Sequence, residues 1–139
     1  MKKVLFVCVH NSARSQMAEA FLNFLAPDRF KAQSAGLKPG KLNPLVVEAM
    51  REMGIDISHH KTKRIEEVLQ KNQIFDYVIT VCDETSAEQC PSLPGKVKWL
   101  HWSFHDPSEF TGSHDEKLKL TKNVRDQIKS QIAHWLNIH

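Results

Sequence analysis

A cysteine and an arginine near the N-terminus have the residue types and the spacing of a thiol-based oxyanion site. Cys8 lies in a continuous apolar run, and five residues separate it from Arg14. A loop of that length can wrap its backbone N–H groups around a tetrahedral oxyanion, and the planar guanidinium of Arg14 can bind two of the oxygens. A Cys8 thiolate would then attack the central atom. The alternative is a buried core thiol, which is common for cysteine.

The residues between and beside this pair complete the candidate oxyanion-binding loop. A helix N-terminus after the loop favours anions and lowers the pKa of a nearby thiol. Ser15 could hydrogen-bond the Cys8 sulfur, and Asn11 could brace the loop because asparagine tolerates a left-handed backbone. Helix capping is the alternative for both side chains. The predicted loop consists of Val9, His10, Asn11, Ser12, Ala13, Arg14 and Ser15.

An aspartate and two further cysteines are the other candidates for chemistry. Asp106 precedes Pro107. A carboxylic acid above the bound anion could protonate a leaving oxygen, although an isolated Asp-Pro pair is also an ordinary turn signal. Seven residues separate Cys82 from Cys90. If that segment is helical, the two sulfurs start about 12 Å apart, and a disulfide would require it to unwind. The alternative is an inert, buried Cys82 and an incidental Cys90.

The hydrophobic pattern predicts the elements that position these residues. Val4–Val9 is an apolar run typical of a buried parallel strand, and helical spacing follows from Gln16 to Leu25. Further strands are predicted at Phe30–Ser34, Asp76–Val81 and Lys96–Leu100, and further helices at Asn43–Gly54, from Thr62 to about Gln70, and at Asp115–Leu136, with one or two helical turns at Asp83–Gln89.

Strands that alternate with helices indicate an α/β fold, a four-stranded parallel sheet covered on both faces in three α/β/α layers. In such folds the ligand site lies beyond the carboxyl ends of the strands. Cys8, Cys82 and the loop that follows Leu100 all fall at that edge of the sheet. The pattern therefore directs three candidate reactive segments to one place.

Composition narrows the class of protein. The 139 residues suit a single domain spanning 1–139, and a net charge of +3 is too mild to indicate a nucleic-acid or membrane partner. The first apolar run is too short for a secretory signal, so a cytoplasmic protein is expected. Three cysteines are an odd number, which disfavours a structural disulfide framework. No Cys/His spacing suits zinc, so His59, His60, His101 and His105 are interpreted as solvated loop residues, and no metal or cofactor is expected.

With these residues assembled, the sequence resembles the thioredoxin-coupled arsenate reductases, which share a fold with the low-molecular-weight protein tyrosine phosphatases. The resemblance covers nearly the whole chain. It rests on Cys8–Ser15 with the following Gln16-Met17-Ala18-Glu19, on Ser34-Ala35-Gly36, Asn43-Pro44, Gly54–Ser58, Thr80-Val81-Cys82, Cys90-Pro91 and Asp106-Pro107. The loop and the Asp-Pro pair belong to both families, whereas the pair of Cys82 and Cys90 belongs to the reductase branch.

What the resemblance implies is a relay of three cysteines. Cys8 attacks arsenate while Arg14 and the loop hold its oxygens and Asp106 helps a hydroxyl leave. Cys82 then attacks Cys8, which releases arsenite and leaves a transient Cys8–Cys82 disulfide. Cys90 attacks Cys82 in turn, and thioredoxin reduces the resulting Cys82–Cys90 disulfide. Phosphate and sulfate are expected to act as analogues of arsenate, and the protein is expected to be a monomer.

Two features depart from the family's pattern. Cys82 and Cys90 are one residue further apart than in the best-known reductases, and Val9 and His10 replace smaller loop residues.

A third departure concerns a cation. Some members hold a structural potassium ion near residues that match Asn11, Glu19 and Ser34, together with an aspartate. Lys63 stands at the position of that aspartate. Its ammonium could substitute for the cation, so we predict that activity is independent of potassium.

Two other functions remain open from the sequence. A phosphotyrosine-type phosphatase would use the same loop, but Ser108, Glu109 and Phe110 follow Asp106-Pro107 in place of the paired tyrosines typical of that branch. A weak phosphatase activity is still expected. The other alternative is a non-catalytic redox sensor that binds an anion or a metalloid and uses Cys82 and Cys90. Such a sensor would not need the general acid. Trp99, Trp102 and Phe104 are predicted to form core and site wall.

Overall fold

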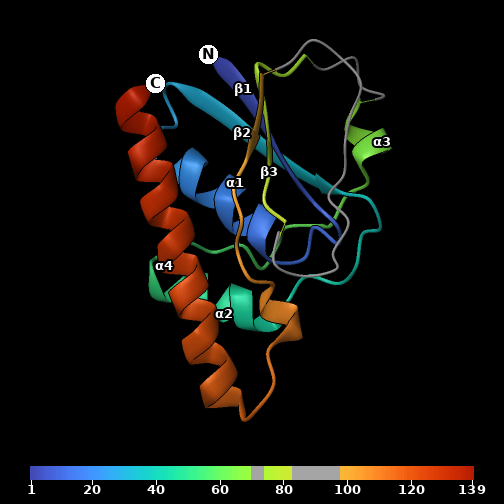
Figure 1. Ribbon diagram of the computed structural model, residues 1–139, viewed down its shortest axis with the longest axis vertical. Coiled ribbons are helices and arrows are strands. Elements are labelled where there is room, and N and C mark those ends of the chain that lie inside the picture. Colours follow the sequence, from blue (N-terminus) through green and yellow to red (C-terminus); the bar gives the residue numbers. More distant parts are fainter. Residues whose placement is uncertain (70–73, 83–97) are drawn as a thin grey trace.

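The computed structural model describes residues 1–69, 74–82 and 98–139 (Figure 1). Its elements, in chain order, are β1 (Lys2–Cys8), α1 (Arg14–Leu25), β2 (Phe30–Gly36), α2 (Pro44–Glu52), α3 (Ile65–Leu69), β3 (Tyr77–Thr80), β4 (Lys98–His101), the 3-10 turn η1 (Pro107–Glu109) and α4 (His114–Ile138).

The four strands form one parallel sheet in the order β2-β1-β3-β4, which confirms the predicted α/β fold with a four-stranded parallel sheet. β1 lies inside the sheet, and its residues from Val4 to Cys8 are buried. A strand that is buried on both faces is apolar throughout, as this run is. The parallel register pairs Val7 of β1 with Thr80 of β3, so both strands end at the same edge of the sheet.

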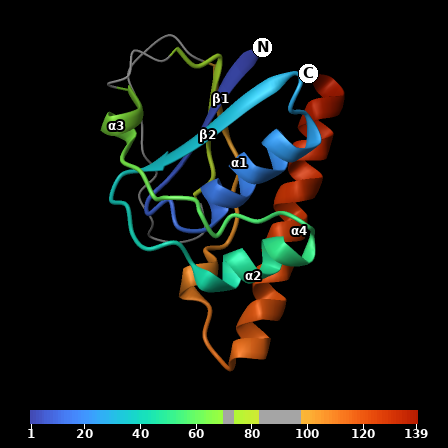
Figure 2. The ribbon, with the colours of Figure 1, turned by 180° about the vertical axis from the view of Figure 1, so that it is seen from behind.

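Helices cover both faces of the sheet. Figures 1 and 2 show α1, α2 and α4 on one side and α3 on the other. The larger apolar cluster joins alternate residues of β1, such as Val4 and Phe6, to the inner faces of α1 and α4. The smaller cluster joins Leu5 and Val7 to α3. The alternation of β1 side chains between the two clusters follows from the two-residue period of a strand.

Two predicted boundaries were wrong. The second strand was expected to end at Ser34, but β2 continues through Gly36, which pairs with Cys8 and donates its backbone N–H to Lys63 O at 2.8 Å. Thr62 was expected to cap a helix, but its hydroxyl donates to Gly40 O at 2.7 Å, and α3 begins only at Ile65. In both cases a contact with a distant segment outweighs the local sequence preference.

The other helix boundaries agree closely with the expected ones. Asn43 caps α2 by accepting a hydrogen bond from the backbone N–H of Leu45, and Gly54 follows that helix with a positive φ of 77°. The last helix, α4, begins with a capping box between Ser113 and Glu116. The segments predicted at Asp83–Gln89 and around Gln70 lie outside the described residues.

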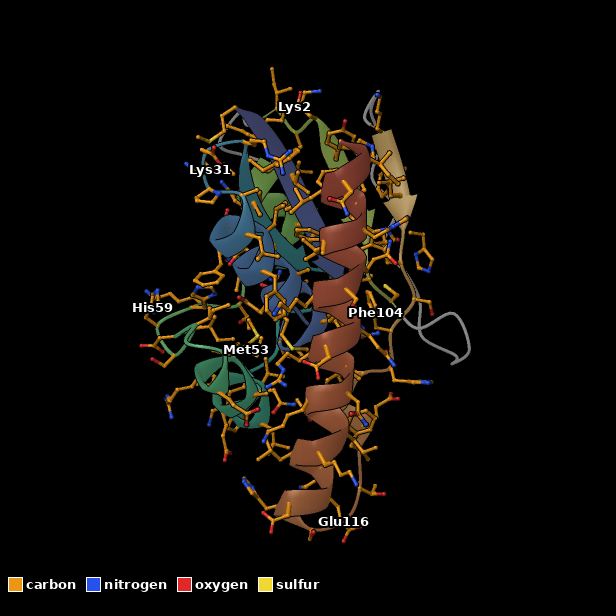
Figure 3. All side chains as sticks on the ribbon, turned by 90° about the vertical axis from the view of Figure 1, so that its left-hand side faces the viewer. Lys2, Lys31, Met53, His59, Phe104 and Glu116 are labelled. Carbon is orange, nitrogen blue, oxygen red and sulfur yellow. The ribbon has the colours of Figure 1, made fainter. Side chains whose placement is uncertain are left out.

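The aromatic residues before the Asp-Pro pair lie in the core, as expected. Trp102 and Phe104 are buried in the larger cluster, and Trp99 packs against the smaller one. Figure 3 shows Phe104 beside α4, with His59 projecting from the opposite side of the molecule. None of the helices in the described ranges has the length and apolar character of a membrane span.

Candidate active site

Cys8 ends β1 with its sulfur surrounded by hydrogen-bond donors. The backbone N–H of Asn11 donates to Cys8 Sγ at 3.0 Å, and Ser15 Oγ lies 2.9 Å from the same sulfur. Asn11 Nδ2 donates to Ser15 Oγ at 2.8 Å, and the hydroxyl of Ser15 donates to the sulfur when Cys8 is a thiolate, which can only accept. Asn11 has a left-handed backbone with a φ of 53°, as predicted. Two donors therefore converge on the thiol.

Burial and hydrogen bonding act on the Cys8 thiol in opposite directions. The side chain is only 2% exposed, and this burial raises the pKa of Cys8 above the ordinary value for a thiol. The hydrogen bond with Ser15, the charge of Arg14 and the N–H of Asn11 lower it, but by less than burial raises it. Burial therefore opposes the lowering that we expect from the helix N-terminus, because the sulfur is more deeply buried than the sequence indicates.

Arg14 is the first residue of α1 and is also buried. Its Nη1 donates to the backbone oxygen of Phe104 at 3.1 Å, and its Nη2 lies 3.5 Å from Asp106 Oδ2. These two contacts hold the guanidinium through a segment that is distant in the sequence, since Phe104 lies 90 residues after Arg14. A planar guanidinium fixed in this way presents a rigid fork of donors.

Asp106 is oriented by the turn that follows it. Its Oδ1 accepts a hydrogen bond from the backbone N–H of Ser108 at 2.9 Å, so Asp106 caps η1 and its other oxygen faces Arg14. Pro107 occupies the first position of that turn, where its fixed φ is favourable. Ser108 Oγ in turn accepts from Asn43 Nδ2 at 3.1 Å, which joins the Asp-Pro turn to the start of α2. The turn predicted at the Asp-Pro pair is therefore confirmed, and the role of Asp106 as a proton donor stays a prediction.

The loop from Val9 to Ser15 is also held along its outer side. Residues 37–43 run beside it, and four of their backbone N–H groups donate to the carbonyl of Cys8 and to three loop carbonyls. The pairs are Leu37 N to Cys8 O at 3.3 Å, Lys38 N to Val9 O at 2.9 Å, Gly40 N to His10 O at 2.9 Å and Asn43 N to Ser12 O at 3.0 Å. His10 adds a contact between its Nδ1 and Lys38 O at 3.1 Å.

The first turn of α1 has features that suit an anion. Ala13 precedes the helix, and among the described residues no side chain caps this end and no acidic residue lies in its first turn. The first N–H groups of a helix lack partners within the helix and carry partial positive charge, so they favour an anion. Together with Arg14, they give a tetrahedral oxyanion donors of two kinds beside the Cys8 sulfur.

The sheet brings the strand that leads to Cys82 alongside β1. Val81 donates its backbone N–H to Val7 O at 3.0 Å, one residue before each cysteine. Cys82 is fully buried, at the same edge of the sheet as Cys8. Cys90 lies outside the described residues, so its predicted pairing with Cys82 stays a prediction.

Two of the four histidines expected to be solvated loop residues differ from that expectation. His101 is the last residue of β4, where its Nδ1 contacts Thr80 Oγ1. The other is His60. His59 is exposed, as expected for a solvated residue, whereas His60 is partly buried and faces the protein. Its Nδ1 lies 2.9 Å from Gln16 Oε1 and 3.2 Å from Glu19 Oε2. Burial lowers the pKa of His60, with the neighbouring charges of His59 and Lys63 acting in the same direction. The adjacent pair His59-His60 is the only signal in the sequence, and it does not indicate which of the two rings is buried.

The residues expected near a cation are gathered around Glu19. Ser34 Oγ donates to Glu19 Oε1 at 3.2 Å, and Lys63 Nζ lies 3.9 Å from that oxygen. Lys63 also donates its backbone N–H to Asn11 Oδ1 at 2.9 Å. Burial raises the pKa of Glu19, and the charge of Lys63 and the bonds from Ser34 oppose this. Within the described ranges, no three His, Cys, Asp or Glu side chains are grouped so as to hold a metal ion.

The first strand of the parallel sheet ends in a thiol, and a loop and a helix that opens with an arginine follow it. This arrangement defines the class of phosphatase-like α/β proteins with a thiol site. The chain belongs to the low molecular weight phosphotyrosine protein phosphatase family, whose model matches residues 3–138.

Within that class, the chain is similar to proteins named arsenate reductase. The arsenate reductase of Bacillus subtilis (strain 168) is 40% identical over 134 residues, which are 96% of this chain and 94% of that protein. Among solved structures, an arsenate reductase in the phosphate binding state is 32% identical, with a TM-score of 0.77 and coverage of 99% of this chain and 98% of that one. A thioredoxin-dependent arsenate reductase of Corynebacterium glutamicum is 31% identical, with a TM-score of 0.61. The match covers 96% of this chain and 62% of that one.

Proposed function

We propose that this protein reduces arsenate to arsenite, with Cys8 as the nucleophile and Cys82 and Cys90 as the resolving thiols. The observation that carries the proposal is the β1–β3 register, because it brings the end of the Cys82 strand beside the thiol site of Cys8. A hydrolase needs only the first thiol and its anion site. A second buried cysteine at the same edge of the sheet supports thiol–disulfide chemistry instead.

The first step is attack by Cys8 sulfur on the arsenic atom. An S–As bond forms, one As–O bond breaks, and the oxygen leaves as water after Asp106 delivers a proton to it. Arg14 and the N–H groups of the loop hold the remaining oxygens. The donors on the sulfur, Asn11 N–H and Ser15 hydroxyl, stabilise the thiolate that must form from a thiol whose pKa is raised by burial.

The second and third steps move the disulfide outward. Cys82 thiolate attacks Cys8 sulfur, the S–S bond forms, and the electron pair of the broken S–As bond stays on arsenic, which leaves as arsenite. Cys90 thiolate then attacks Cys82 sulfur, and Cys8 departs as a thiolate ready for another cycle. A dithiol reductant must finally reduce the Cys82–Cys90 disulfide, and we propose thioredoxin for this role because of the likeness to a thioredoxin-dependent reductase.

Several further expectations belong to this proposal. Phosphate should bind at the loop as an unreactive analogue of arsenate, in keeping with the related reductase in the phosphate binding state. We propose a monomeric, cytoplasmic enzyme, since the reducing cytosol keeps its thiols ready for catalysis.

The relay is tested by measuring arsenate turnover with a thioredoxin system for the wild type, Cys82→Ser and Cys90→Ser. Both variants should lose multiple turnover. Each should keep its activity on a small aryl phosphate, since that reaction needs only Cys8, Arg14 and Asp106. Unimpaired arsenate turnover in Cys90→Ser would contradict the relay as drawn.

A phosphotyrosine-type phosphatase is the second candidate, and the family match favours it directly. The same loop would form a cysteinyl phosphate, which water would hydrolyse. Aryl phosphate hydrolysis that exceeds arsenate reduction in the wild type, and that is unaffected by loss of Cys82, would establish this function instead.

A further inference from the structure

Gln16 is a wholly buried polar side chain that the reaction steps above do not use. It lies in the first turn of α1, two residues after Arg14. Its Nε2 is within hydrogen-bond distance of three oxygens: Asn11 O at 3.2 Å, Asn11 Oδ1 at 3.2 Å and Lys61 O at 3.1 Å. Its Oε1 lies 2.9 Å from His60 Nδ1. Every polar atom of the amide is therefore engaged inside the protein.

These contacts determine which way the amide faces. Reversing it would place an oxygen against three acceptor oxygens, so the NH₂ group must face Asn11 and Lys61. Because Oε1 can only accept, the Nδ1 of His60 carries a proton and donates it to Gln16. The side chain thus joins the oxyanion-binding loop to residues 60–61.

The residue that Gln16 holds is the one that contacts the thiol. Asn11 has a φ of 53°, a conformation that non-glycine residues adopt at a cost. That conformation aims its backbone N–H at Cys8 Sγ and its side-chain amide at Ser15 Oγ. If Asn11 relaxes, both donors to the sulfur are displaced together.

We propose that Gln16 is a positioning residue: its amide holds Asn11 in the left-handed conformation and so keeps two hydrogen-bond donors on the Cys8 sulfur. This inference rests on the proposed function in that Cys8 is the nucleophile. The contact with the backbone oxygen of Asn11 is the important one. Asn11 Oδ1 has a second donor in the N–H of Lys63, at 2.9 Å.

Loss of the amide should weaken the thiolate in particular. The N–H of Asn11 and the hydroxyl of Ser15 both lower the pKa of Cys8 against the effect of burial. With those donors displaced, burial acts with less opposition and the thiol becomes harder to ionise. A purely structural residue would change the unfolding transition and leave the ionisation of Cys8 alone.

The test uses Gln16→Met with Asn23→Leu as the matched control. Asn23 belongs to the same helix, and its amide also bonds to a backbone, accepting from Ala32 N at 2.8 Å and donating to Ala32 O at 3.1 Å. Both changes replace an amide with an apolar side chain of similar length. The measurement is the rate of alkylation of Cys8 by iodoacetamide as a function of pH, read by mass spectrometry on the tryptic peptide Val4–Arg14.

Gln16→Met should raise the apparent pKa of Cys8, with about tenfold slower alkylation at neutral pH, since one pKa unit changes the thiolate fraction tenfold. In Asn23→Leu, Cys8 should be alkylated at the wild-type rate, although the substitution lowers the unfolding temperature. Equal alkylation rates for the two variants would overturn the proposal and leave Gln16 a structural residue.

A second variant keeps the inference testable if Gln16→Met does not fold. His60→Phe removes the donor to Gln16 Oε1 and leaves the Gln16 amide itself in place, at a ring that lies near the surface. The same change also removes the contact between His60 and Glu19 Oε2, which does not touch the Cys8 sulfur. His60→Phe should slow alkylation of Cys8 about two- to threefold at neutral pH, a fraction of one pKa unit. A wild-type rate in this variant would count against the proposal. Because alkylation needs no arsenate, a failure of arsenate reduction leaves this result interpretable on its own.

Discussion

Gly36 is a position where the addition of a single methyl group should disturb the oxyanion-binding loop. A Cβ added there would lie 2.7 Å from Val9 O and 2.9 Å from Asn11 N, two backbone atoms of the oxyanion-binding loop. Ordinary contacts begin near 3.4 Å, so the loop would have to move by several tenths of an ångström. Gly36 itself is held by pairing with Cys8 and by its bond to Lys63 O.

We expect Gly36→Ala to destabilise the fold by about 2–3 kcal/mol, the upper part of the usual range for overpacking, because both close contacts are with backbone atoms. At roughly 4 °C per kcal/mol for a chain of this size, the unfolding midpoint should fall by about 8–12 °C. Binding of phosphate should weaken more than the stability loss alone explains, because Val9 and Asn11 belong to the loop that would receive it. Calorimetric titration with phosphate and thermal unfolding measure the two effects.

Gly40→Ala is the matched control, since Gly40 lies in the same connection. A Cβ there would meet only His10 Cβ, at an ordinary 3.6 Å. Both glycines have backbone angles open to alanine, because the positive-φ glycines in the described chain are Gly54 and Gly112. Gly40→Ala should bind phosphate as the wild type does. If Gly36→Ala matches it in stability and affinity, the close packing of strand and loop is not what shapes the site.

Three further predictions concern charges around the loop. Arg14→Lys should weaken phosphate binding at least tenfold in calorimetric titration, because an ammonium cannot replace a bidentate fork held by Asp106; unchanged affinity would refute this. Substrate affinity should be equal in potassium and choline chloride, since Lys63 already supplies a cation 3.9 Å from Glu19; tighter binding in potassium would be the contrary result. Acidification below the ordinary histidine pKa of 6.5 should destabilise the protein, because burial lowers the pKa of His60 and the unfolded chain binds the proton first. Urea unfolding at about pH 7.5 and about pH 5.5 should show a smaller loss for His60→Phe, and an equal loss would contradict it.

The sequence was most informative where chemistry and local structure are encoded in adjacent residues. The apolar run to Cys8, the helix after Arg14 and the tolerance of Asn11 for a left-handed backbone all follow from residue type and spacing, and the structure confirms them. The hydrogen bond between Ser15 and Cys8 was predicted for the same reason. The four-stranded parallel sheet followed from the alternation of strands and helices, whereas the order of its strands came only from the structure.

What could not be predicted depends on contacts between distant segments. The extension of β2 to Gly36 and the role of Thr62 both depend on backbone groups far along the chain. His60 and Gln16 meet across 44 residues, and neither has a local pattern that distinguishes it from a solvated or a core residue. The depth of Cys8, which decides the net direction of its pKa shift, likewise emerges only when the loop, α1 and the Asp-Pro turn close over it.

We expect reduction, and not hydrolysis, to follow attack by Cys8. A single turnover of Cys90→Ser with arsenate, quenched with acid and mapped by mass spectrometry, tests this directly. It should yield one equivalent of arsenite for each protein chain and a trapped disulfide between Cys8 and Cys82. Arsenite without that disulfide, or no arsenite from a protein that still hydrolyses aryl phosphate, would contradict it.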